Sequence, residues 1–493
     1  MKRRTFLKRS LTALALAGAG TGGILLSDKF GFVSPAEAKG FSSSLPIPPL
    51  LENQDKSGKS AIFTMDVQKG NVEFFPGRST STLGYNGNFL GPTIRVRNGQ
   101  RFKIKVNNTL PQVTTLHWHG LHVPAQWDGG PRQPIPAKTT WNPDFVINQE
   151  AATLWYHPHA MGLTGEQVYQ GLAGLFLIED EVSDNLDIPK TYGVDDIPII
   201  IQDRRFFGNG QFAYVQNMRD VMTGVIGNYL LVNGVMQPTL SVPSGMVRLR
   251  LLNGSNSSIY HIAFDDKRTF HVIASDGGFL ERPVPMNTIR LSAGERAEIM
   301  VDFSKESKYA VISLLIDQMG GSRFEAMRIT VNGSARVETI PQTLRTVEKI
   351  PESEATGVRG FIMETMSMGG NRMGMGMMGR RLTINGKKMD INRIDEQVRL
   401  GSTEIWEITN RSAMMMSMPH SMHLHDVQFQ ILSRNGRTPQ PHEQGRKDTV
   451  LIMPGETVRI ISRFRDYTGV YMYHCHLLEH EDDGMMGQFE VIT

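Results

Sequence analysis

Short runs of alternating apolar and polar residues make up most of the chain, and Gly, Pro, Asn and Asp separate one run from the next. Successive side chains of a strand point to opposite faces, so this period of two predicts strands with one buried face. Little of the chain shows the 3.6-residue period of an amphipathic helix. The pattern is typical of antiparallel β-sandwiches and predicts an all-β fold.

One weak repeat occurs three times, each time as a strand, a glycine turn, a second strand and an asparagine. In the first two copies apolar residues alternate with basic ones, which predicts that the basic side chains point away from the core. The copies are GPTIRVRNGQRFKIKVNN (91–108), QPTLSVPSGMVRLRLLNG (237–254) and QVRLGSTEIWEITN (397–410).

Three copies predict three domains, which agrees with the length of 493 residues at roughly 150 residues per domain. We place the domains at residues 45–182, 190–342 and 355–493. Polar, proline-containing stretches form the linkers between them.

Residues 1–38 have the features of an export signal. A basic stretch with Arg3 and Arg4 precedes a weakly apolar run that is too short to span a membrane. The paired arginines resemble the twin-arginine leader, and the sequence Ala36-Glu37-Ala38 forms a cleavage site. We expect a periplasmic protein without stable membrane insertion, exported by the twin-arginine machinery. A membrane anchor that is not cleaved is the alternative.

Charge and cysteine content restrict the function further. The formal net charge is +3 and no basic tract follows the leader, so nothing in the sequence supports nucleic acid binding. The chain has a single cysteine, Cys475, which cannot form an internal disulfide. Cys475 is therefore either buried and inert or part of a functional site.

Ten of the fourteen histidines fall into four short clusters, and each cluster contains a His-x-His pair. Residues i and i+2 of a strand share a face, so each pair offers two imidazoles to one site. Any single pair could be a surface strand or a simple zinc site. Four pairs give eight ligands, which fit about three metal ions. The clusters are His117 and His119; His157 and His159; His420, His423 and His425; and His474, His476 and His480.

The cysteine lies inside the last cluster, between His474 and His476. If both imidazoles share one face of a strand, the thiol points to the other face and serves a separate site. A thiolate, two imidazoles and a distant thioether are the ligands of a blue-copper centre. We assign the remaining ligands of that centre to His420, His480 and Met485.

With these motifs in order, the chain resembles a bacterial multicopper oxidase, of the laccase-like type that includes the copper-efflux oxidases. The resemblance implies three consecutive cupredoxin-like Greek-key domains and four copper ions, with a trinuclear cluster between the first and third domains. It implies that His117 and His423 bind the type 2 copper. The type 3 coppers would take His119, His157 and His476, and His159, His425 and His474, while His122, His261, His271 and His442 would be structural.

The resemblance also implies the reaction, in which one-electron donors supply four electrons to dioxygen and two waters form. Asp128 and Glu481 occupy positions that resemble the acidic residues beside the family's cluster, where a carboxyl relays protons. Each has an alternative role, because Asp128 precedes two glycines as a turn residue would and Glu481 lies in an acidic run.

A methionine-rich segment at residues 363–380 indicates the electron donor. Thioethers are soft ligands suited to Cu(I), so we expect Met363, Met366 and Met418 to bind substrate copper and the segment to hold a labile copper ion. Met416 departs from the acidic residue of the copper-efflux oxidases. The alternative is a flexible loop that binds nothing.

We expect a monomeric cuprous oxidase that also accepts Fe(II) and phenolic donors. A general laccase for phenols is one alternative. A non-catalytic copper-binding or scaffold protein is another.

Overall fold

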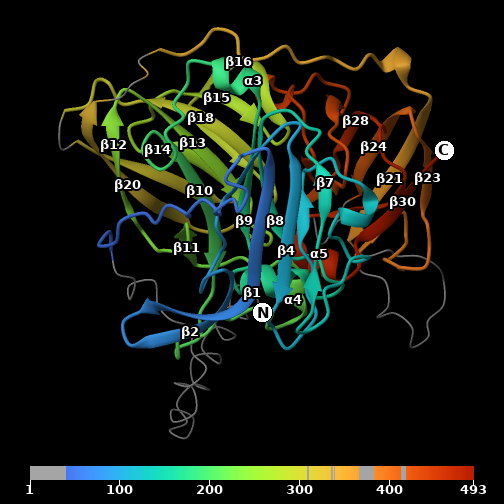
Figure 1. Cartoon of the computed structure of the whole chain (residues 1–493), viewed down its shortest axis with the longest axis horizontal. Helices are drawn as coiled ribbons and strands as arrows, with labels where there is room; N and C mark the ends of the chain where they lie inside the picture. Colours follow the sequence, from blue (N-terminus) through green and yellow to red (C-terminus); the bar gives the residue numbers. More distant parts are fainter. Residues whose placement is uncertain (1–39, 308–309, 335–336, 338, 366–381, 412–417) are drawn as a thin grey trace, which may run out of the picture.

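The computed structural model of the protein describes residues 40–307, 310–334, 337, 339–365, 382–411 and 418–493. In this part of the chain the strands form six sheets, in three pairs that follow one another along the sequence. Figure 1 shows the first pair in front in blue and teal, with the second pair in green and yellow on the left and the third in orange and red on the right. The prediction of an all-β fold with three consecutive cupredoxin-like domains is confirmed.

The first domain packs two sheets around one core. The order in the first sheet is β2 (Arg78–Tyr85), β1 (Ser60–Phe75), β4 (Arg101–Asn108) and β6 (Thr140–Trp141), with β7 (Asp144–Val146) also beside β4. The order in the second is β3 (Ile94–Arg97), β9 (Gly174–Glu179), β8 (Ala152–His157) and β5 (His117–His119).

The second domain has the largest of the apolar cores described. Its first sheet runs β11 (Tyr229–Val232), β10 (Asp196–Arg204), β13 (Met246–Asn253), β18 (Arg296–Asp302), β15 (Phe270–Ser275) and β16 (Gly278–Met286). Its second sheet runs β12 (Thr239–Ser244), β20 (Arg323–Ser334), β19 (Val311–Gln318), β14 (Tyr260–Phe264) and β17 (Thr288–Leu291).

The third domain carries the cysteine. Its first sheet runs β22 (Leu382–Ile384), β21 (Gly357–Thr365), β24 (Thr403–Arg411), β28 (Thr457–Arg463) and β26 (Gln430–Arg434). Its second sheet runs β23 (Glu396–Arg399), β30 (Met486–Ile492), β29 (Gly469–Cys475), β25 (His420–Leu424) and β27 (Thr449–Ile452).

The sequence repeat corresponds to one structural unit in each domain. In each copy the first strand (β3, β12 or β23) forms an edge of one sheet, and the second (β4, β13 or β24) lies inside the other. Both strands of each copy pair in parallel with a neighbour, for example β4 with β1 and β3 with β9. The sheets are therefore not antiparallel throughout, as the pattern typical of antiparallel sandwiches would suggest, because the chain crosses between the two sheets of a domain and pairs strands that are distant in sequence.

The basic face of β13 also differs from the prediction. In β4 burial alternates as expected, but every residue of β13 is buried, including Arg248 and Arg250. Arg250 bonds both carboxylate oxygens of Asp196 and, in the first domain, the Thr153 hydroxyl at 2.8 Å. The face covered by basic residues is thus an interface between domains.

Short helices connect some of the strands. The α-helices are α2 (Thr164–Tyr169), α3 (Glu181–Asn185), α4 (Met218–Thr223) and α5 (Leu478–Asp482), and the 3-10 helices are η2 (Ala125–Trp127), η3 (Glu352–Glu354) and η4 (Pro441–Glu443). Helix α5 of the third domain contacts both α2 and α4. Among the residues described, we find no helix that has both the length and the apolar character needed to span a membrane.

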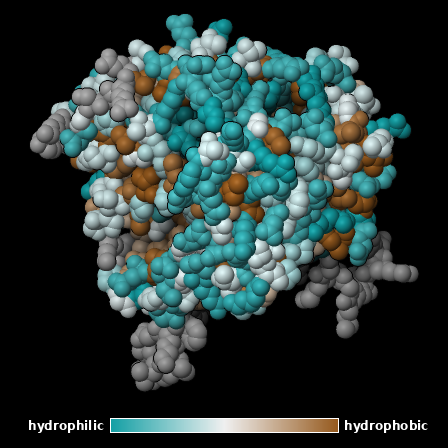
Figure 2. All heavy atoms as spheres, in the orientation of Figure 1, coloured by the Kyte–Doolittle hydropathy of each residue, from teal (hydrophilic) through white to brown (hydrophobic). Residues whose placement is uncertain are grey.

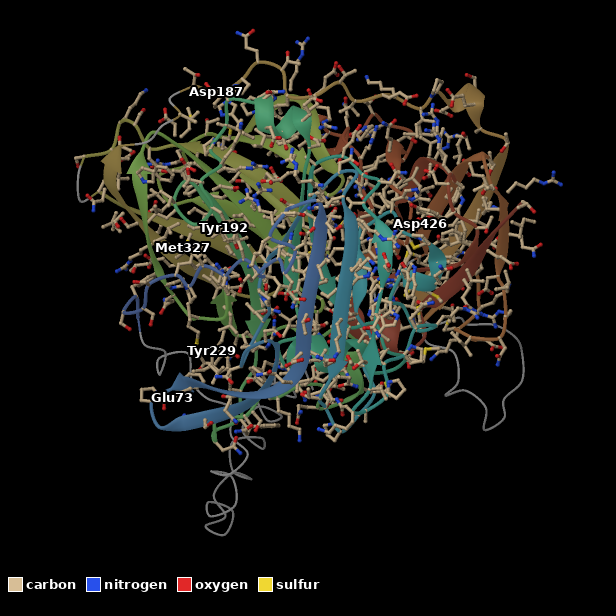
Figure 3. The ribbon with its side chains drawn as sticks, viewed as in Figure 1. Glu73, Asp187, Tyr192, Tyr229, Met327 and Asp426 are labelled. Atoms are coloured by element: carbon tan, nitrogen blue, oxygen red, sulfur yellow. The ribbon has the colours of Figure 1, made fainter. Side chains whose placement is uncertain are left out.

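The surface is mixed in character. On the face in Figure 2, hydrophobic residues form small patches separated by polar ones. Figure 3 labels Asp426, which lies where the first and third domains meet. Its Oδ1 accepts the Val123 N–H at 3.2 Å and lies 2.8 Å from Nδ1 of His122. The histidine motifs of both domains face this junction.

Candidate metal centre

Strand register brings the His-x-His pairs together. In the first domain His117 of β5 lies opposite His157 of β8, and in the third domain His423 of β25 lies opposite His474 of β29. The second histidine of three pairs, namely His159, His425 and His476, lies just beyond the strand end. The two domains meet at these ends, and all eight histidines are buried there. We call these eight residues the histidine cluster.

Three histidines of the cluster converge through their Nε2 atoms. Nε2 of His474 lies 3.2 Å from Nε2 of both His159 and His425. The Nδ1 atoms of His425 and His474 face acceptors, since Oδ2 of Asp128 is 2.8 Å away and the carbonyl of Cys475 is 3.1 Å away. In a neutral imidazole the proton then sits on Nδ1, so the Nε2 lone pairs face one another. A cation between these lone pairs would remove their mutual repulsion. We call this arrangement of His159, His425 and His474 the first position.

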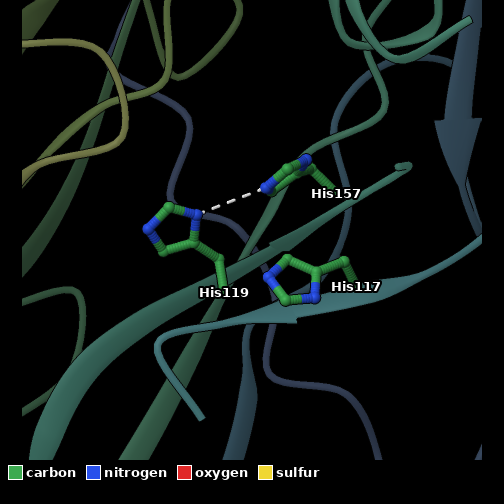
Figure 4. Close-up of side chains that lie close together, drawn as sticks. All are labelled: His117, His119 and His157. Atoms are coloured by element: carbon green, nitrogen blue, oxygen red, sulfur yellow. Dashed lines mark hydrogen bonds between the residues drawn. The ribbon is translucent and has the colours of Figure 1, made fainter. Parts of the chain in front are cut away.

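A second position lies between His119 and His157, whose Nδ1 and Nε2 atoms are 3.4 Å apart (Figure 4). The other nitrogen of each ring faces an acceptor: the Pro158 carbonyl at 2.8 Å for His157, and Oδ1 of Asp448 at 3.0 Å for His119. Two lone pairs therefore face each other here as well. The ring of His476 lies 4.7 Å from that of His119 and 5.4 Å from that of His157.

A third position involves His117 and His423. Nδ1 of His117 lies 2.9 Å from the Asp128 carbonyl, and Nδ1 of His423 lies 2.8 Å from the Asp448 carbonyl. The Nε2 atoms of both residues are buried without a hydrogen-bond partner in the described chain, as are both ring nitrogens of His476. A buried nitrogen without a partner is costly, and metal binding removes that cost. The cluster therefore fits a set of metal ions.

Burial keeps seven of the eight cluster histidines in the protonation state that a metal requires. It lowers the pKa of His117 and, more strongly, the pKa values of six others, with the neighbouring histidines adding to the effect for most of them. A neutral imidazole offers a lone pair, whereas a protonated one does not.

A separate site surrounds the thiol of Cys475, as the alternation of strand faces predicts. Sγ lies 3.5 Å from Nδ1 of His420 and 3.6 Å from Nδ1 of His480. Burial raises the pKa of the thiol to about 12, so a thiolate is stable here only beside a cation. We call Cys475, His420 and His480 the cysteine site.

The backbone ties Met485 to the cysteine site. Its carbonyl accepts the Cys475 N–H at 3.0 Å, and its N–H donates to the His480 carbonyl at 2.9 Å. Its side chain is buried in the same core as Cys475. Met485 therefore lies next to the cysteine site, and its role as the axial ligand stays a prediction.

The two predicted proton-relay residues lie against the cluster. Besides its bond to His425, Asp128 has Oδ1 3.5 Å from Nδ1 of His117, and burial raises its pKa to about 6. It also follows η2 directly, so its position in a turn and its contact with the cluster go together. Glu481, buried in α5, lies 3.1 Å from Nδ1 of His159 and 3.2 Å from Nδ1 of His474.

The methionines predicted to bind substrate copper lie in different environments. Met363 is fully buried in the third-domain core, because the alternation of β21 turns Phe361 and Met363 inward. Met363 therefore belongs to the apolar core, and its role in binding substrate copper stays a prediction. Met418, two residues before His420, is partly exposed. Met366 and most of the methionine-rich segment lie outside the described residues.

The histidines predicted to be structural lie outside the cluster. His122 sits between Asp426 and Asp466, which raise its pKa to about 9 although burial opposes the shift. His261 and His271 lie on strands of the second domain, and His442 lies in η4.

Sequence reasoning missed Asp448 and Thr365, which contact the two sites, and Arg296, which contacts Asp448. Asp448 bonds His119 as described, and Arg296 of the second domain bonds both oxygens of Asp448 at 2.7 and 2.6 Å. The hydroxyl of Thr365 lies 3.1 Å from Nε2 of His420. A charge directly before the apolar run of β27 is a weak signal for Asp448. We find no local signal for Arg296 or Thr365.

Comparison with known proteins gives a consistent result. Three models, each described as multicopper oxidase, match residues 66–183, 191–332 and 364–493. A multicopper oxidase of Staphylococcus aureus is 38% identical, covering 91% of this chain and 92% of its own. The solved structure of a laccase-like multicopper oxidase, CueO, from Ochrobactrum sp. has a TM-score of 0.82 and 39% identity, over 91% of this chain and 100% of its own. The cell division protein FtsP of Escherichia coli is 37% identical, over 92% of this chain and 94% of its own.

Proposed function

Because the chain belongs to the multicopper oxidases, we propose that it couples one-electron oxidation of Cu(I), and also of Fe(II) and phenols, to the four-electron reduction of dioxygen to water. We propose a role in copper tolerance on the same basis. Copper is the cofactor of this family, and the two sites offer the soft thiolate and imidazole ligands that copper prefers.

The position of Cys475 carries the proposal. Its thiol belongs to the cysteine site, while its neighbours His474 and His476 belong to the histidine cluster. The two sites are therefore joined through three consecutive residues. A storage protein has no use for such a link, whereas an oxidase needs one to deliver electrons from the donor side to the oxygen side.

We assign the four coppers as the resemblance to this family implies. The cysteine site, with Met485, would hold the type 1 ion. The first and second positions would hold the type 3 pair, and the third position the type 2 ion. When bound, these ions supply four one-electron stores, which equal the electrons that dioxygen needs to become two waters.

We assign proton delivery at the cluster to Asp128 and Glu481. Each carboxyl faces two cluster histidines, one from the first domain and one from the third. Since the pKa of Asp128 is raised to about 6 by burial, its carboxyl can hold a proton near neutral pH and release it. Both carboxyls are nevertheless buried, so the protons must reach them through the protein.

The surroundings of the cysteine site favour a small donor. Nε2 of His420 faces the Thr365 hydroxyl, Nε2 of His480 lies 3.1 Å from the Met222 carbonyl of α4, and both rings are fully buried. A bulky phenol cannot stack against either ring edge unless these contacts open. A cuprous ion can instead reach the site through thioethers such as that of Met418.

The test is steady-state oxidation of Cu(I), Fe(II) and a bulky phenol, followed by oxygen uptake. We expect kcat/KM to be largest for Cu(I). A larger value for the phenol would support a general laccase instead.

The likeness to FtsP supports a second candidate, an exported relative that acts as a scaffold rather than an enzyme. The complete set of nitrogen and sulfur donors favours the oxidase. Copper analysis of the purified chain separates the two candidates, because a scaffold needs no copper and should consume no oxygen.

We also propose that the protein is a monomer, exported folded to the periplasm by the twin-arginine route. The leader that motivates this proposal lies outside the described residues. Replacing Arg3 and Arg4 by lysine should leave the chain in the cytoplasm, as cell fractionation would show.

A further inference from the structure

The second domain contributes no histidine to the cluster, yet one of its turns lies against it. This turn, residues 292–296, connects β17 to β18 and is buried throughout. We call it the second-domain turn. The hydroxyl of Ser292 in this turn is hydrogen-bonded to the hydroxyl of Ser421 in the third domain, at 2.9 Å. The turn therefore lies beside β25, the strand that carries His423.

Arg296 acts on His119 through Asp448. The guanidinium of Arg296 donates to both oxygens of Asp448, at 2.7 and 2.6 Å, which fixes the plane of that carboxylate. Oδ1 of Asp448 lies 3.0 Å from Nε2 of His119 and also accepts the Thr449 hydroxyl at 2.9 Å. A carboxylate that only accepts hydrogen bonds keeps the imidazole proton on Nε2. His119 must then present Nδ1 to the second position.

Gly294 acts on His476 by direct contact. A Cβ atom added at Gly294 would lie 2.9 Å from Nδ1 of His476, and the glycine has a φ of +86°. His476 has no hydrogen-bond partner on either ring nitrogen within the described residues, so packing alone orients its ring. The absence of a side chain at Gly294 leaves space for this orientation.

The same guanidinium also contacts a neighbour of each of the other two histidines of the second position. Nη1 of Arg296 donates to the Gly294 carbonyl at 3.1 Å, and Nε donates to the Thr153 carbonyl at 3.1 Å. Thr153 belongs to β8, the strand that ends at His157. One buried side chain thus holds Asp448 behind His119, Gly294 against His476, and the strand of His157.

We propose that the second-domain turn is a positioning element for the second position, in which Arg296 and Gly294 hold His119, His157 and His476 in the arrangement that binds one copper ion. Arg296 is a positioning residue, since it contacts no cluster histidine itself. The inference rests on the proposed oxidase function. It gives the domain without ligands a specific part in the copper centre.

The first test replaces Arg296 by Met. Loss of a residue that orients a metal ligand typically costs about 10–100-fold in metal affinity. We expect copper at the second position to be held 10–100-fold less tightly in a chelator competition, while the blue absorption of the cysteine site persists. Two neighbouring Cu(II) ions couple their spins and give no signal in electron paramagnetic resonance. Loss of the ion at the second position should therefore produce a signal from the ion at the first position. Arg296→Lys keeps the charge and should recover part of the affinity.

The matched control is Arg250→Met. Arg250 is also buried at a domain interface and also bonds a carboxylate twice, but its partners Asp196, Glu298 and Thr153 are not cluster ligands. This variant should bind copper as the unmodified protein does, even if it unfolds at a lower temperature. Equal copper loss in both variants, or full copper retention in Arg296→Met, overturns the proposal.

A second pair of variants tests the contact with His476 and does not depend on a buried charge. Gly294→Ala adds one methyl group against the ring, whereas Gly401→Ala adds the same group at a similar φ of +81° with nothing within 4 Å. Only Gly294→Ala should weaken copper binding at the second position. Both variants are compared with the unmodified protein. If the unmodified protein itself binds no copper or consumes no oxygen, the proposed function is refuted, and not only the role of the second-domain turn.

Discussion

At the scale of single residues, the strongest expectation concerns Cys475. Because its thiol is the one sulfur donor next to both His420 and His480 that can become a thiolate, Cys475→Ser should abolish the blue absorption and all turnover. Most of the cluster copper should remain, since the cluster histidines are fixed by other contacts. Visible absorption, oxygen uptake and copper content check this. Retained oxidase activity would contradict the assigned electron path.

Asp128 allows a test of proton delivery. Asp128→Asn keeps the shape of the side chain but removes its acidic proton, so dioxygen reduction should slow by about 100-fold or more while donor oxidation changes little. Stopped-flow measurement of the two half-reactions checks this. Asp426→Asn is the control, because that carboxyl is also buried near the cluster but faces His122. Equal slowing of both half-reactions would indicate a structural role for Asp128.

Met485 allows a test of the axial ligand. Met485→Leu should raise the reduction potential of the cysteine site, because removing a weak sulfur donor destabilises Cu(II) more than Cu(I). The site should stay blue. Redox titration checks this, with Met486→Leu as the control. A shift in the control variant alone would identify Met486 as the axial ligand.

The residues that could be predicted from sequence have their signal in local spacing. The motifs His-x-His and His-Cys-His predict metal binding from three residues alone, because strand geometry decides which side chains share a face. Asp448 and Arg296 could not be predicted, since Arg296 belongs to another domain and meets Asp448 only in the folded chain. Thr365 is likewise brought to His420 by strand packing.

At the scale of elements, the structure changes how the methionine-rich segment should be tested. Thr365 of β21 pairs with Leu382 of β22, so residues 366–381 connect the two strands of a hairpin. Removing residues from 363 onward would also delete Met363 from the core and Thr365 from its contact with His420. Replacing residues 366–381 by Asn-Gly keeps both, because two residues can close such a hairpin.

This replacement should lower Cu(I) oxidation severalfold, maintain or increase phenol oxidation, and leave all four coppers bound. The reason is that thioethers can transfer Cu(I) from one to the next, while a segment of this length beside the cysteine site can hinder a large donor. Added Cu(II) should stimulate phenol oxidation less than in the intact chain. An unchanged ratio of Cu(I) to phenol turnover would mean that the segment is a passive linker.

The strands themselves were predictable only in part. The alternation in β4 matches its burial, but the same pattern in β13 does not, because the first domain covers the basic face of β13. The period of the sequence shows which residues are polar. It does not show whether another domain covers them and supplies hydrogen-bond partners. The parallel pairings are missed for the same reason, since they join strands that are distant in sequence.

At the scale of the whole molecule, three domains must be held in fixed relation, because the cluster is built from two of them and packed against the third. Buried charges provide much of this hold. Arg250 bonds Asp196 in the second domain and Thr153 in the first, and Glu298 also bonds Thr153, at 2.6 Å. Charges at such an interface stabilise it only if each keeps its partner.

The last prediction concerns the loss of one such partner. Arg250→Met leaves Asp196 and Glu298 with fewer cationic partners, which should cost about 3–5 kcal/mol of unfolding free energy and lower the thermal midpoint.

The same interface makes stability depend on pH. Burial alone would raise the pKa values of the Asp196 and Glu298 carboxyls, yet Arg250 and Arg248 hold them below their ordinary values. A lowered pKa stabilises the folded state above the unfolded pKa, and this contribution disappears as the pH falls below about 4. The unmodified protein should therefore lose stability between about pH 5 and 3, and the variant should lose less over that range. Thermal unfolding at several pH values checks this, and parallel curves for the two proteins would show that Arg250 does not govern the ionisation of the interface.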